Sequence, residues 1–479
     1  MTFIEIVHYF GATARSYSVV SSLAVDAVAA GAEVSILDIG ASTVIRQGFP
    51  PRWIAKLFGH TVNPHAFAAV LEQHEIDLIP LPMTKQELSA SAAVNDMLEQ
   101  ALESELLTYF RLDHIPSTRE ARELTKRLRA AMHATYESLT ERWHSARPDA
   151  VYIPNGRTSR QKAARLAAEE LSIPIKLYEN GRALPQSYYL GNTQPHDRVA
   201  SQQELLDGFP LPQGKALAEV ADTWLSHRMD REKGTNLFSQ SWSAKGSDQR
   251  TEPAGKLAVF FASSFDEFVA FGPMWSIDHW DSQFDAFDRM MTILEEQGVS
   301  LVMRLHPNLG SKSRQYFLRE TKEVLALQKR HPTLRIYWHN DPINSYDLVE
   351  QADYVIVERS TIGLEASLMG KPVWVTQASQ WDLVADVRQM LAPSEITEDS
   401  MRLWKPSPRG AQQFVAYWVA QEFPFRFPWE TWSDWDPERA PLSMKIAQLA
   451  VNNSWRHKIR LVRLELAQRR NRRFVPPEK

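Results

Sequence analysis

The sequence predicts an α/β protein with two doubly wound domains, each a mostly parallel sheet covered by helices. Three apolar runs (301–305, 354–357 and 372–375) either end in polar groups or begin just after a helix, which is typical of parallel strands joined by helices. The N-terminus opens with a strand–helix–strand pattern. At 479 residues the chain is too long for one ordinary core, so two domains are expected.

The first domain is expected to cover residues 1–200. Its strands are short apolar runs rich in residues that favour β-structure, and its helices show apolar positions at helical spacing. The long helix is marked by a stripe of Leu124, Leu128, Met132, Tyr136, Leu139 and Trp143. The expected elements are, in order, strand 3–8, helix 18–30 ended by Gly31, strand 33–39, the long helix, strand 149–153, helix 160–171 and strand 173–178.

The second half divides into three parts. Residues 201–255 are polar and are expected to form a helix and an inter-domain linker. A second sheet starts at 256–262, and its strand–helix units define a domain over 256–400. Residues 401–479 form an aromatic and basic helical tail.

The tail allows two interpretations. Trp455, Ile459, Val462 and Leu466 make one apolar stripe with many arginines around it, so the helix could lie on an anionic membrane surface. Alternatively, it packs back over the protein, crossing to the N-terminal domain. A second aromatic and basic segment at 46–58 is either a lipid- or acceptor-facing helix or an ordinary surface helix.

The composition sets limits on function. Apolar content of 44% and charged content of 23% are normal for a globular protein, and a net charge of −4 gives no general attraction to nucleic acid. The chain has no cysteine, which excludes disulfides and thiolate chemistry. We expect neither a signal peptide nor a membrane-spanning helix, and therefore a cytoplasmic location. No P-loop, GxGxxG or HExxH motif is present, and we expect no metal and no cofactor.

His306 and Pro307 directly follow the predicted strand 301–305, which contains Arg304. An imidazole at a strand end can donate a hydrogen bond to a phosphate oxygen, and proline would fix the turn. The alternative is a histidine bonded to a loop carbonyl. Arg304 is expected to be one of the donor-binding residues.

The segment from Glu358 to Glu365 follows another strand and opens a helix. Ser360 and Thr361 place hydroxyls at the helix N-terminus, where backbone N–H groups favour a phosphate. The simpler interpretation is a cap at Ser360, with Gly363 for close packing. Glu365 is expected to accept hydrogen bonds from a ribose, or to be a surface carboxylate.

Two other strand ends are expected to complete the site. Glu179 ends a strand, where its carboxylate could remove a proton from a hydroxyl, although it could equally be a solvated turn residue. Gly181 would let the backbone approach a ligand. The same rim is expected to include Gly11, Asn155, Arg157 and Arg182, which could bind an acceptor or brace the Glu179 loop. His8 could be an alternative base, and its simpler interpretation is a buried structural residue. On the other domain, Ser263, Ser264, Asp266 and Glu267 are expected to line the opposite wall.

The chain resembles GT-B glycosyltransferases of bacterial capsule and surface-polysaccharide biosynthesis. Its HP and Ser/Thr motifs are similar to those of bacterial sialyl-, polysialyl- and Kdo-transferases and of CDP-glycerol transferases. One departure is that Glu179-Asn180 stands where those families have two acidic residues before glycine. The resemblance lies in VYIPNGR (151–157), KLYENGR (176–182), FFASSFDEF (260–268), MRLHPN (303–308) and ERSTIGLEASLMGKPV (358–373), about half of the two domains.

The resemblance implies a GT-B fold, with two facing Rossmann-like domains and a deep cleft between them. It also implies transfer from a nucleotide-sugar, with CMP-linked donors favoured, to a glycan or lipid-linked acceptor. Glu179 would be the base, while His306, Ser360 and Thr361 would stabilise the departing phosphate in an inverting, metal-independent reaction. The alternatives are a CDP-glycerol-type glycerophosphotransferase, a sugar-nucleotide epimerase and a non-catalytic glycan-binding assembly protein.

Overall fold

The protein divides into two compact units. In this computed structural model the described residues are 2–9, 14–40, 64–81, 90–110, 112–229, 255–264, 268–275, 279–432 and 466–475. The first unit comprises 1–110, 114–195 and 421–463, and the second comprises 111–113, 196–420 and 464–479. The chain after residue 420 therefore contributes residues 421–432 to the first unit and residues 466–475 to the second.

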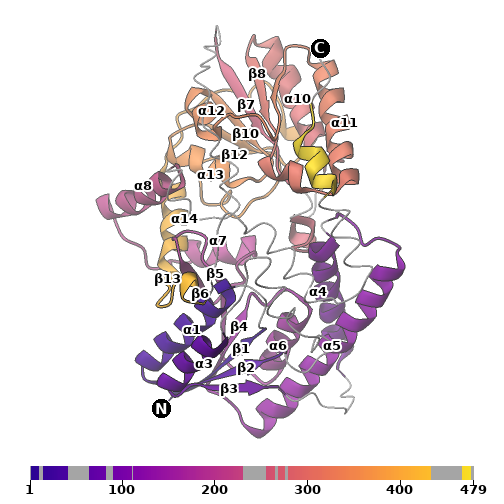
Figure 1. The fold of residues 1–479 in the computed structure, drawn as a ribbon. Coiled ribbons are helices and arrows are strands. Elements are labelled where there is room, and N and C mark those ends of the chain that lie inside the picture. The colour runs from indigo at the N-terminus through magenta and orange to yellow at the C-terminus, as the bar shows by residue number, and fades with distance from the viewer. Residues whose placement is uncertain are drawn as a thin grey trace. The chain divides into compact units, whose positions relative to one another are not determined.

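The first unit contains a seven-stranded sheet with the order β13-β6-β5-β4-β1-β2-β3 (Figure 1). The five strands β1 to β5 run parallel, whereas β6 and β13 are antiparallel additions at one edge. The strands are β1 (Thr2–His8), β2 (Ala32–Asp38), β3 (Asp77–Pro80), β4 (Ala150–Pro154), β5 (Ile175–Asn180), β6 (Ser187–Gly191) and β13 (Glu422–Pro424).

Helices cover both faces of this sheet, with α1 and α3 on one side and α5 and α6 on the other (Figure 1). The predicted apolar stripe from Leu124 to Trp143 is confirmed, because all six residues are buried on α5. Thr118 caps α5, its hydroxyl accepting a hydrogen bond from the Ala121 N–H at 3.1 Å. The helices are α1 (Ala14–Ala29), α3 (Pro64–Gln73), α4 (Ala92–Phe110), α5 (Arg119–Ser145) and α6 (Ser159–Glu170).

The second unit contains a six-stranded, wholly parallel sheet with the order β12-β11-β10-β7-β8-β9. Strands β7, β10 and β11 are continuous apolar runs, as expected of strands covered on both faces. The strands are β7 (Leu257–Phe261), β8 (Ser300–Arg304), β9 (Arg335–Tyr337), β10 (Tyr354–Val357), β11 (Val373–Val375) and β12 (Arg388–Gln389).

Figure 1 shows α10 and α11 on one face of the second sheet, and α12 and α13 on the other. Ser282 caps α10 in a reciprocal capping box with Asp285, and Asn344 caps α12. The helices are α7 (Arg198–Leu206), α8 (Lys215–Met229), α10 (Gln283–Glu296), α11 (Arg314–Arg330), α12 (Ser345–Gln351), α13 (Thr361–Leu368) and α14 (Arg409–Ala420).

Both units are Rossmann-like, which confirms the predicted α/β class. Counted within each unit, the strands follow the 3-2-1-4-5-6 order of dinucleotide-binding folds. In such sheets ligands bind beyond the carboxyl ends of the strands, where the strand order reverses. That point lies between β1 and β4 in the first unit and between β7 and β10 in the second. The cleft expected between the domains stays a prediction.

Some sequence predictions fall outside the described residues. These are Gly11, the segment 46–58, Asp266 and Glu267, and the tail stripe before Leu466. Within the described part of the chain, no helix combines the length and the hydropathy that crossing a bilayer requires.

Candidate functional site

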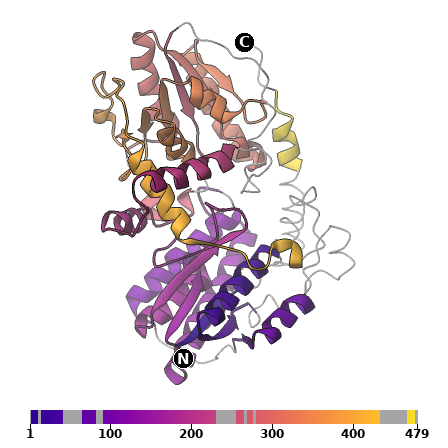
Figure 2. The ribbon, with the colours of Figure 1, turned by 90° about the vertical axis from the view of Figure 1, so that its left-hand side faces the viewer.

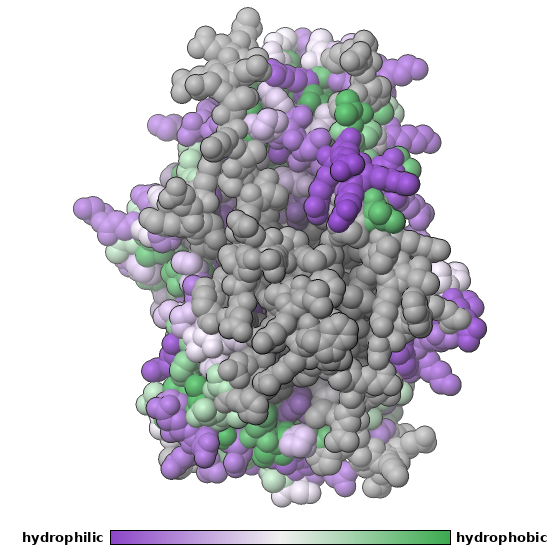
Figure 3. Space-filling view, viewed as in Figure 1, coloured by the Kyte–Doolittle hydropathy of each residue, from purple (hydrophilic) through white to green (hydrophobic). Residues whose placement is uncertain are grey.

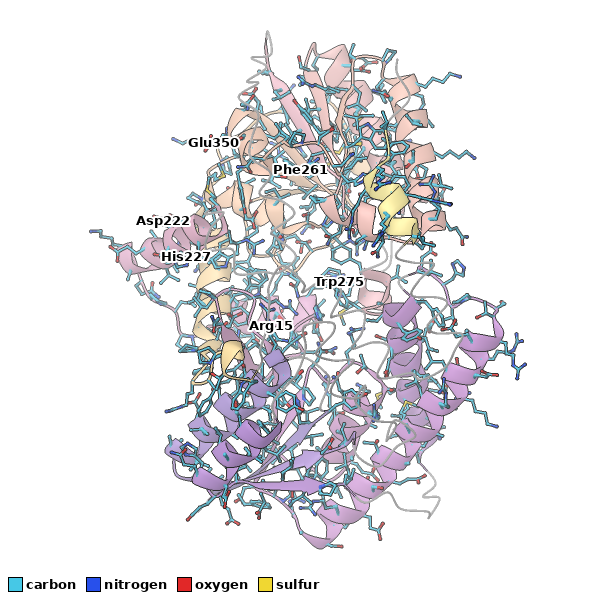
Figure 4. All side chains as sticks on the ribbon, in the orientation of Figure 1. Arg15, Asp222, His227, Phe261, Trp275 and Glu350 are labelled. Atoms are coloured by element: carbon cyan, nitrogen blue, oxygen red, sulfur yellow. The ribbon has the colours of Figure 1, made fainter. Side chains whose placement is uncertain are left out.

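Polar residues gather at the carboxyl edge of the second sheet, where three central strands end side by side. Phe261, the last residue of β7 (labelled in Figure 4), pairs with Arg304 of β8 and Val357 of β10. Ser263 and His306, two residues further on, therefore lie at the same level of the edge. Neighbouring strands are about 4.8 Å apart, so β8 and β10 are roughly 10 Å apart across β7. This edge brings the predicted donor-binding segments together at the switch point of the sheet.

His306 begins the 3-10 helix η3 (Pro307–Ser311) and is half-buried. Its Nδ1 accepts a hydrogen bond from the Asn308 N–H at 3.1 Å. Because Nδ1 is the acceptor, the neutral ring carries its proton on Nε2. That tautomer can donate to an anion, as the predicted phosphate contact requires.

The N-terminus of α13 carries the two predicted hydroxyls, and both Ser360 and Thr361 are half-buried. The Ser360 hydroxyl caps the helix, accepting a hydrogen bond from the Ile362 N–H at 3.5 Å. A Cβ added at Gly363 would lie 2.6 Å from the Trp381 ring and 2.9 Å from a Val357 methyl group. Gly363 thus lets α13 pack closely on β10, as the simpler interpretation expected, and its role in donor binding stays a prediction.

Glu358 is fully buried beside Arg359, whose guanidinium lies 3.3 Å from its carboxylate. Burial raises the pKa of Glu358, while Arg359 and the Ser263 hydroxyl act in the opposite direction. Arg359 also donates to the carbonyl of Trp275 (labelled in Figure 4) at 2.7 Å. Ser263 and Ser264 are buried in the same edge. These groups hold the loop after β7, and their contact with a donor stays a prediction.

The side chains of Arg304 and Glu365 are both bonded to other residues of the second unit. Arg304 is buried and donates to the Trp338 carbonyl, and burial lowers its pKa to about 10, so it stays charged. The fully buried Glu365 carboxylate pairs with Arg228 of α8 and accepts a hydrogen bond from Tyr346. The Glu365 carboxylate is therefore already engaged in an ion pair, and the ribose contact predicted for it stays a prediction.

In the first unit, Glu179 and Asn155 meet at the carboxyl edge of β4 and β5. Asn155 Nδ2 donates to Glu179 Oε2 at 2.9 Å, and the Arg182 guanidinium lies 3.5 Å from the same oxygen. Asn155 (φ +52°) and Gly156 (φ +77°) both adopt left-handed backbone conformations, which turn the chain sharply off β4. Asn155 is 92% buried and its Oδ1 has no hydrogen-bond partner among the described residues. The structure thus brings three predicted rim residues together.

A residue that sequence reasoning missed holds the same loop. The Glu422 carboxylate, on β13, accepts hydrogen bonds from the backbone N–H groups of residues 182–184 and from the Ser187 hydroxyl. The last two backbone bonds and the hydroxyl bond are each 2.8 Å. Gly181 is required beside it, because an added Cβ would lie 2.6 Å from Glu422 Oε2. No local pattern identified Glu422, since it lies about 240 residues from the loop it contacts.

Arg157 is also held by a neighbouring helix. Its Nη1 donates to Ser104 at 2.6 Å and to Thr108 at 3.2 Å, both on α4. Burial lowers its pKa, an effect that the charges of Glu179 and Glu105 partly offset. Arg157 therefore braces the turn after β4, and an acceptor contact stays a prediction.

His8 is the buried structural residue that the simpler interpretation expected. Its Nδ1 lies 2.8 Å from the Tyr178 hydroxyl, which itself donates to the Val7 carbonyl at 2.7 Å. Because that hydroxyl has one hydrogen, Nδ1 must be the donor in the first bond. Burial lowers the pKa of His8 to about 3, so the ring is neutral at physiological pH.

Two further features bear on the chemistry. Within the described ranges, no group of three histidine, aspartate or glutamate side chains is placed to hold a metal ion. A cavity of about 480 Å³ in the second unit lies away from the candidate edge. Its lining includes Leu257 and Ser300, the first residues of β7 and β8, and none of the predicted site residues. We therefore place the site by strand topology and side chains, not by this cavity.

Comparison with known proteins gives only distant likenesses. No protein-family model matches the chain, and no curated protein matches it. Among solved structures, the KpsC β-Kdo 2,4-transferase of Thermosulfurimonas dismutans is 17% identical, with a TM-score of 0.35, over 56% of this chain and 79% of that one. UDP-GlcNAc 2-epimerase from Neisseria meningitidis, bound to UDP-GlcNAc, is 13% identical, with a TM-score of 0.30, over 88% of this chain and all of that one. Because identities and TM-scores are low, we base the function of this chain on its own residues.

Proposed function

We propose that the protein is a GT-B glycosyltransferase that moves a sugar from a nucleotide-sugar to a glycan or lipid-linked acceptor in surface-polysaccharide synthesis. The observation that carries this proposal is the carboxyl edge of the second sheet. There, a histidine with its proton on Nε2 and the Ser360-Thr361 helix start lie on either side of the β7 end. Donors of this kind stabilise a leaving phosphate.

In the proposed reaction, an acceptor hydroxyl oxygen attacks the anomeric carbon of the donor sugar. The bond between that carbon and the phosphate oxygen breaks, and the nucleotide leaves with the electron pair. The hydroxyl proton passes to the Glu179 carboxylate, which Asn155 orients at 2.9 Å. Single displacement inverts the anomeric configuration.

The leaving group would be stabilised by protein donors. His306 would donate from Nε2, and the hydroxyls and backbone N–H groups at the start of α13 would hold the phosphate oxygens. These donors supply the charge stabilisation for which other transferases use a metal. We favour a CMP-linked donor because of the HP and Ser/Thr motifs.

The test is product analysis with purified full-length protein. A panel of CMP-, CDP-, UDP-, GDP- and dTDP-linked donors is incubated with oligosaccharide acceptors, with EDTA present, and products are read by mass spectrometry. We expect acceptor mass to increase by one sugar residue. An increase by glycerol phosphate would identify the CDP-glycerol alternative, and conversion of the donor without acceptor would identify an epimerase.

A supporting proposal concerns the membrane. Arg469, Arg470, Arg472 and Arg473 are exposed on the described C-terminal segment, and Figure 3 shows a strongly hydrophilic patch there. Such a patch suits the anionic inner face of a cytoplasmic membrane. We expect the protein to sediment with phosphatidylglycerol vesicles and not with phosphatidylcholine vesicles. Equal sedimentation with both would reject a charge-based association.

A further inference from the structure

The chain beyond residue 420 places buried polar side chains against both candidate catalytic loops. In the first unit this is Glu422, whose carboxylate is held by three backbone N–H groups and the Ser187 hydroxyl. The bonded segment, 182–187, begins three residues after Glu179 on the chain. Four donors on one carboxylate fix both the edge strand and the loop.

In the second unit the equivalent side chain is Asn471, which is fully buried. Its Nδ2 donates to the Lys312 carbonyl at 3.1 Å, and its Oδ1 accepts from Arg314 at 2.9 Å. Its backbone carbonyl accepts a hydrogen bond from His339 Nε2 at 3.0 Å. Lys312 directly follows η3, the 3-10 helix that His306 begins, so Asn471 binds the far end of the His306 loop.

Two neighbouring contacts reinforce this attachment. Gln468 Nε2 donates to the Ser311 carbonyl at 2.5 Å, inside η3 itself. The Phe474 ring packs 5.0 Å from the Trp338 ring and 5.3 Å from the Phe317 ring. Figure 2 shows the yellow C-terminal helix lying against the second unit. The described tail is thus part of the wall that supports the His306 loop.

We propose that Glu422 and Asn471 are positioning residues, which set the places of Glu179 and His306 respectively and act on substrate only through them. The proposal rests on the proposed function, because it assigns each residue to one step of that reaction. Glu422 governs proton removal from the acceptor. Asn471 governs binding of the donor phosphate.

Each substitution removes a defined set of contacts to one loop. Glu422→Gln keeps the shape of the side chain but turns an NH2 group toward donors in the 182–184 loop, so at least one backbone N–H loses its acceptor. The loop then shifts, and a reacting group displaced by about 1 Å can lose up to about a hundredfold in rate. Asn471→Ala removes the side-chain bonds to the Lys312 carbonyl, which directly follows η3, and to Arg314 of α11, and it leaves the Gln468 bond to η3 in place.

Full-length variants separate the two effects. For Glu422→Gln we expect kcat to fall about tenfold or more, with the nucleotide Kd unchanged within about twofold. For Asn471→Ala we expect the nucleotide Kd, measured by calorimetry, to rise about tenfold. The exposed variants Glu99→Gln in the first unit and Lys329→Gln in the second are matched controls and should behave as wild type.

Double variants distinguish positioning from general destabilisation. Glu179→Gln combined with Glu422→Gln should be no slower than Glu179→Gln alone, because the base that Glu422 positions is already absent. His306→Ala combined with Asn471→Ala should bind nucleotide no more weakly than His306→Ala alone. Additive losses in both pairs would overturn the inference.

Hydrogen exchange tests the bracing without any activity. Amides in 181–187 should exchange faster in Glu422→Gln, and those in 308–312 should exchange faster in Asn471→Ala. Unchanged protection in both would overturn the inference even if wild type transfers sugar. If the two variants exchange faster as expected but the wild-type protein neither binds nucleotides nor transfers sugar, the proposed function is rejected and the bracing stands.

Discussion

Replacing Gly181 by alanine is a direct test of the first candidate site. The residue is not in a left-handed conformation, so only space opposes a side chain there. An added Cβ would lie 1.8 Å from the Ser187 hydroxyl oxygen, 2.9 Å from Ser187 Cβ and 2.6 Å from Glu422 Oε2. These side chains cannot simply swing away from the added Cβ, because the Ser187 hydroxyl donates a hydrogen bond to the Glu422 carboxylate at 2.8 Å.

The magnitude follows from the two ways in which the loop can respond. If it keeps its place, overpacking should cost about 1 to 3 kcal/mol of unfolding free energy. If it moves, the Glu422 hydrogen bonds weaken, and Glu179 is displaced from its position beside Asn155. We expect transfer to fall about a hundredfold in the second case, with nucleotide binding unchanged.

The assay measures kcat, nucleotide affinity and urea-induced unfolding on Gly181→Ala and on a control, Gly31→Ala. Gly31 has a φ of +88° and nothing within 4 Å of an added Cβ, so alanine there is strained without a clash. We expect the control to lose about 1 kcal/mol of unfolding free energy and to keep wild-type activity. Wild-type turnover together with wild-type stability in Gly181→Ala would refute the role given to this loop.

Three further predictions follow from buried groups. Burial lowers the pKa of His8 from 6.5 to about 3, so the unfolded state binds more protons below pH 6.5 and the stability of the protein falls as the pH drops. Between pH 7 and 5 we expect urea denaturation to show a loss of about 2 kcal/mol in unfolding free energy, and a smaller loss in His8→Gln. Equal losses in the two proteins would reject this role of His8. Gly363→Ala should destabilise the protein by about 1 to 3 kcal/mol through its clash with Trp381, and unchanged thermal unfolding would contradict this packing. Arg228→Met should lower the unfolding free energy by about 3 to 5 kcal/mol, because it leaves the Glu365 carboxylate unpaired in the interior. Adding Glu365→Gln should recover part of that loss. A loss of unfolding free energy below about 1 kcal/mol in Arg228→Met would show that the ion pair contributes little.

The sequence predicted the local elements that depend on apolar runs. The strand expected at 354–357 has those bounds as β10, because four consecutive apolar residues suit a strand buried on both faces. The helix expected at 18–30 instead begins at Ala14. Its first turn contains the polar residues Arg15 and Ser16, which do not continue the apolar pattern that predicted the helix. The strand expected at 173–178 runs from Ile175 to Asn180.

That last shift has a non-local cause. Glu179 and Asn180 belong to β5 because they pair with Tyr189 and Tyr188 of β6, and β6 in turn pairs with β13. β13 comes from residues 422–424, more than 230 positions later. Pairing at such separation leaves no local sequence signal, so neither β13 nor the role of Glu422 could be predicted.

Among the candidate site residues, the sequence predicted the position at the strand ends better than the direction of each side chain. Asn155 and Glu179 meet as expected, and Ser263 and His306 reach the same sheet edge. Glu365 was expected to face a ribose, but its partner Arg228 lies on a helix of the polar segment 201–255, where no pattern signalled a buried cation.

The central claim is that the carboxyl edge of the second sheet holds the phosphate of a nucleotide donor. Calorimetric titration of the full-length protein with CMP, CDP, UDP, GDP and dTDP tests it most directly, comparing wild type with a Ser360→Ala, Thr361→Val double variant. We expect wild type to bind one of these nucleotides in the micromolar range and the variant to bind it about tenfold more weakly or worse. Equal affinity in the two proteins, or no binding of any nucleotide by wild type, would contradict the claim.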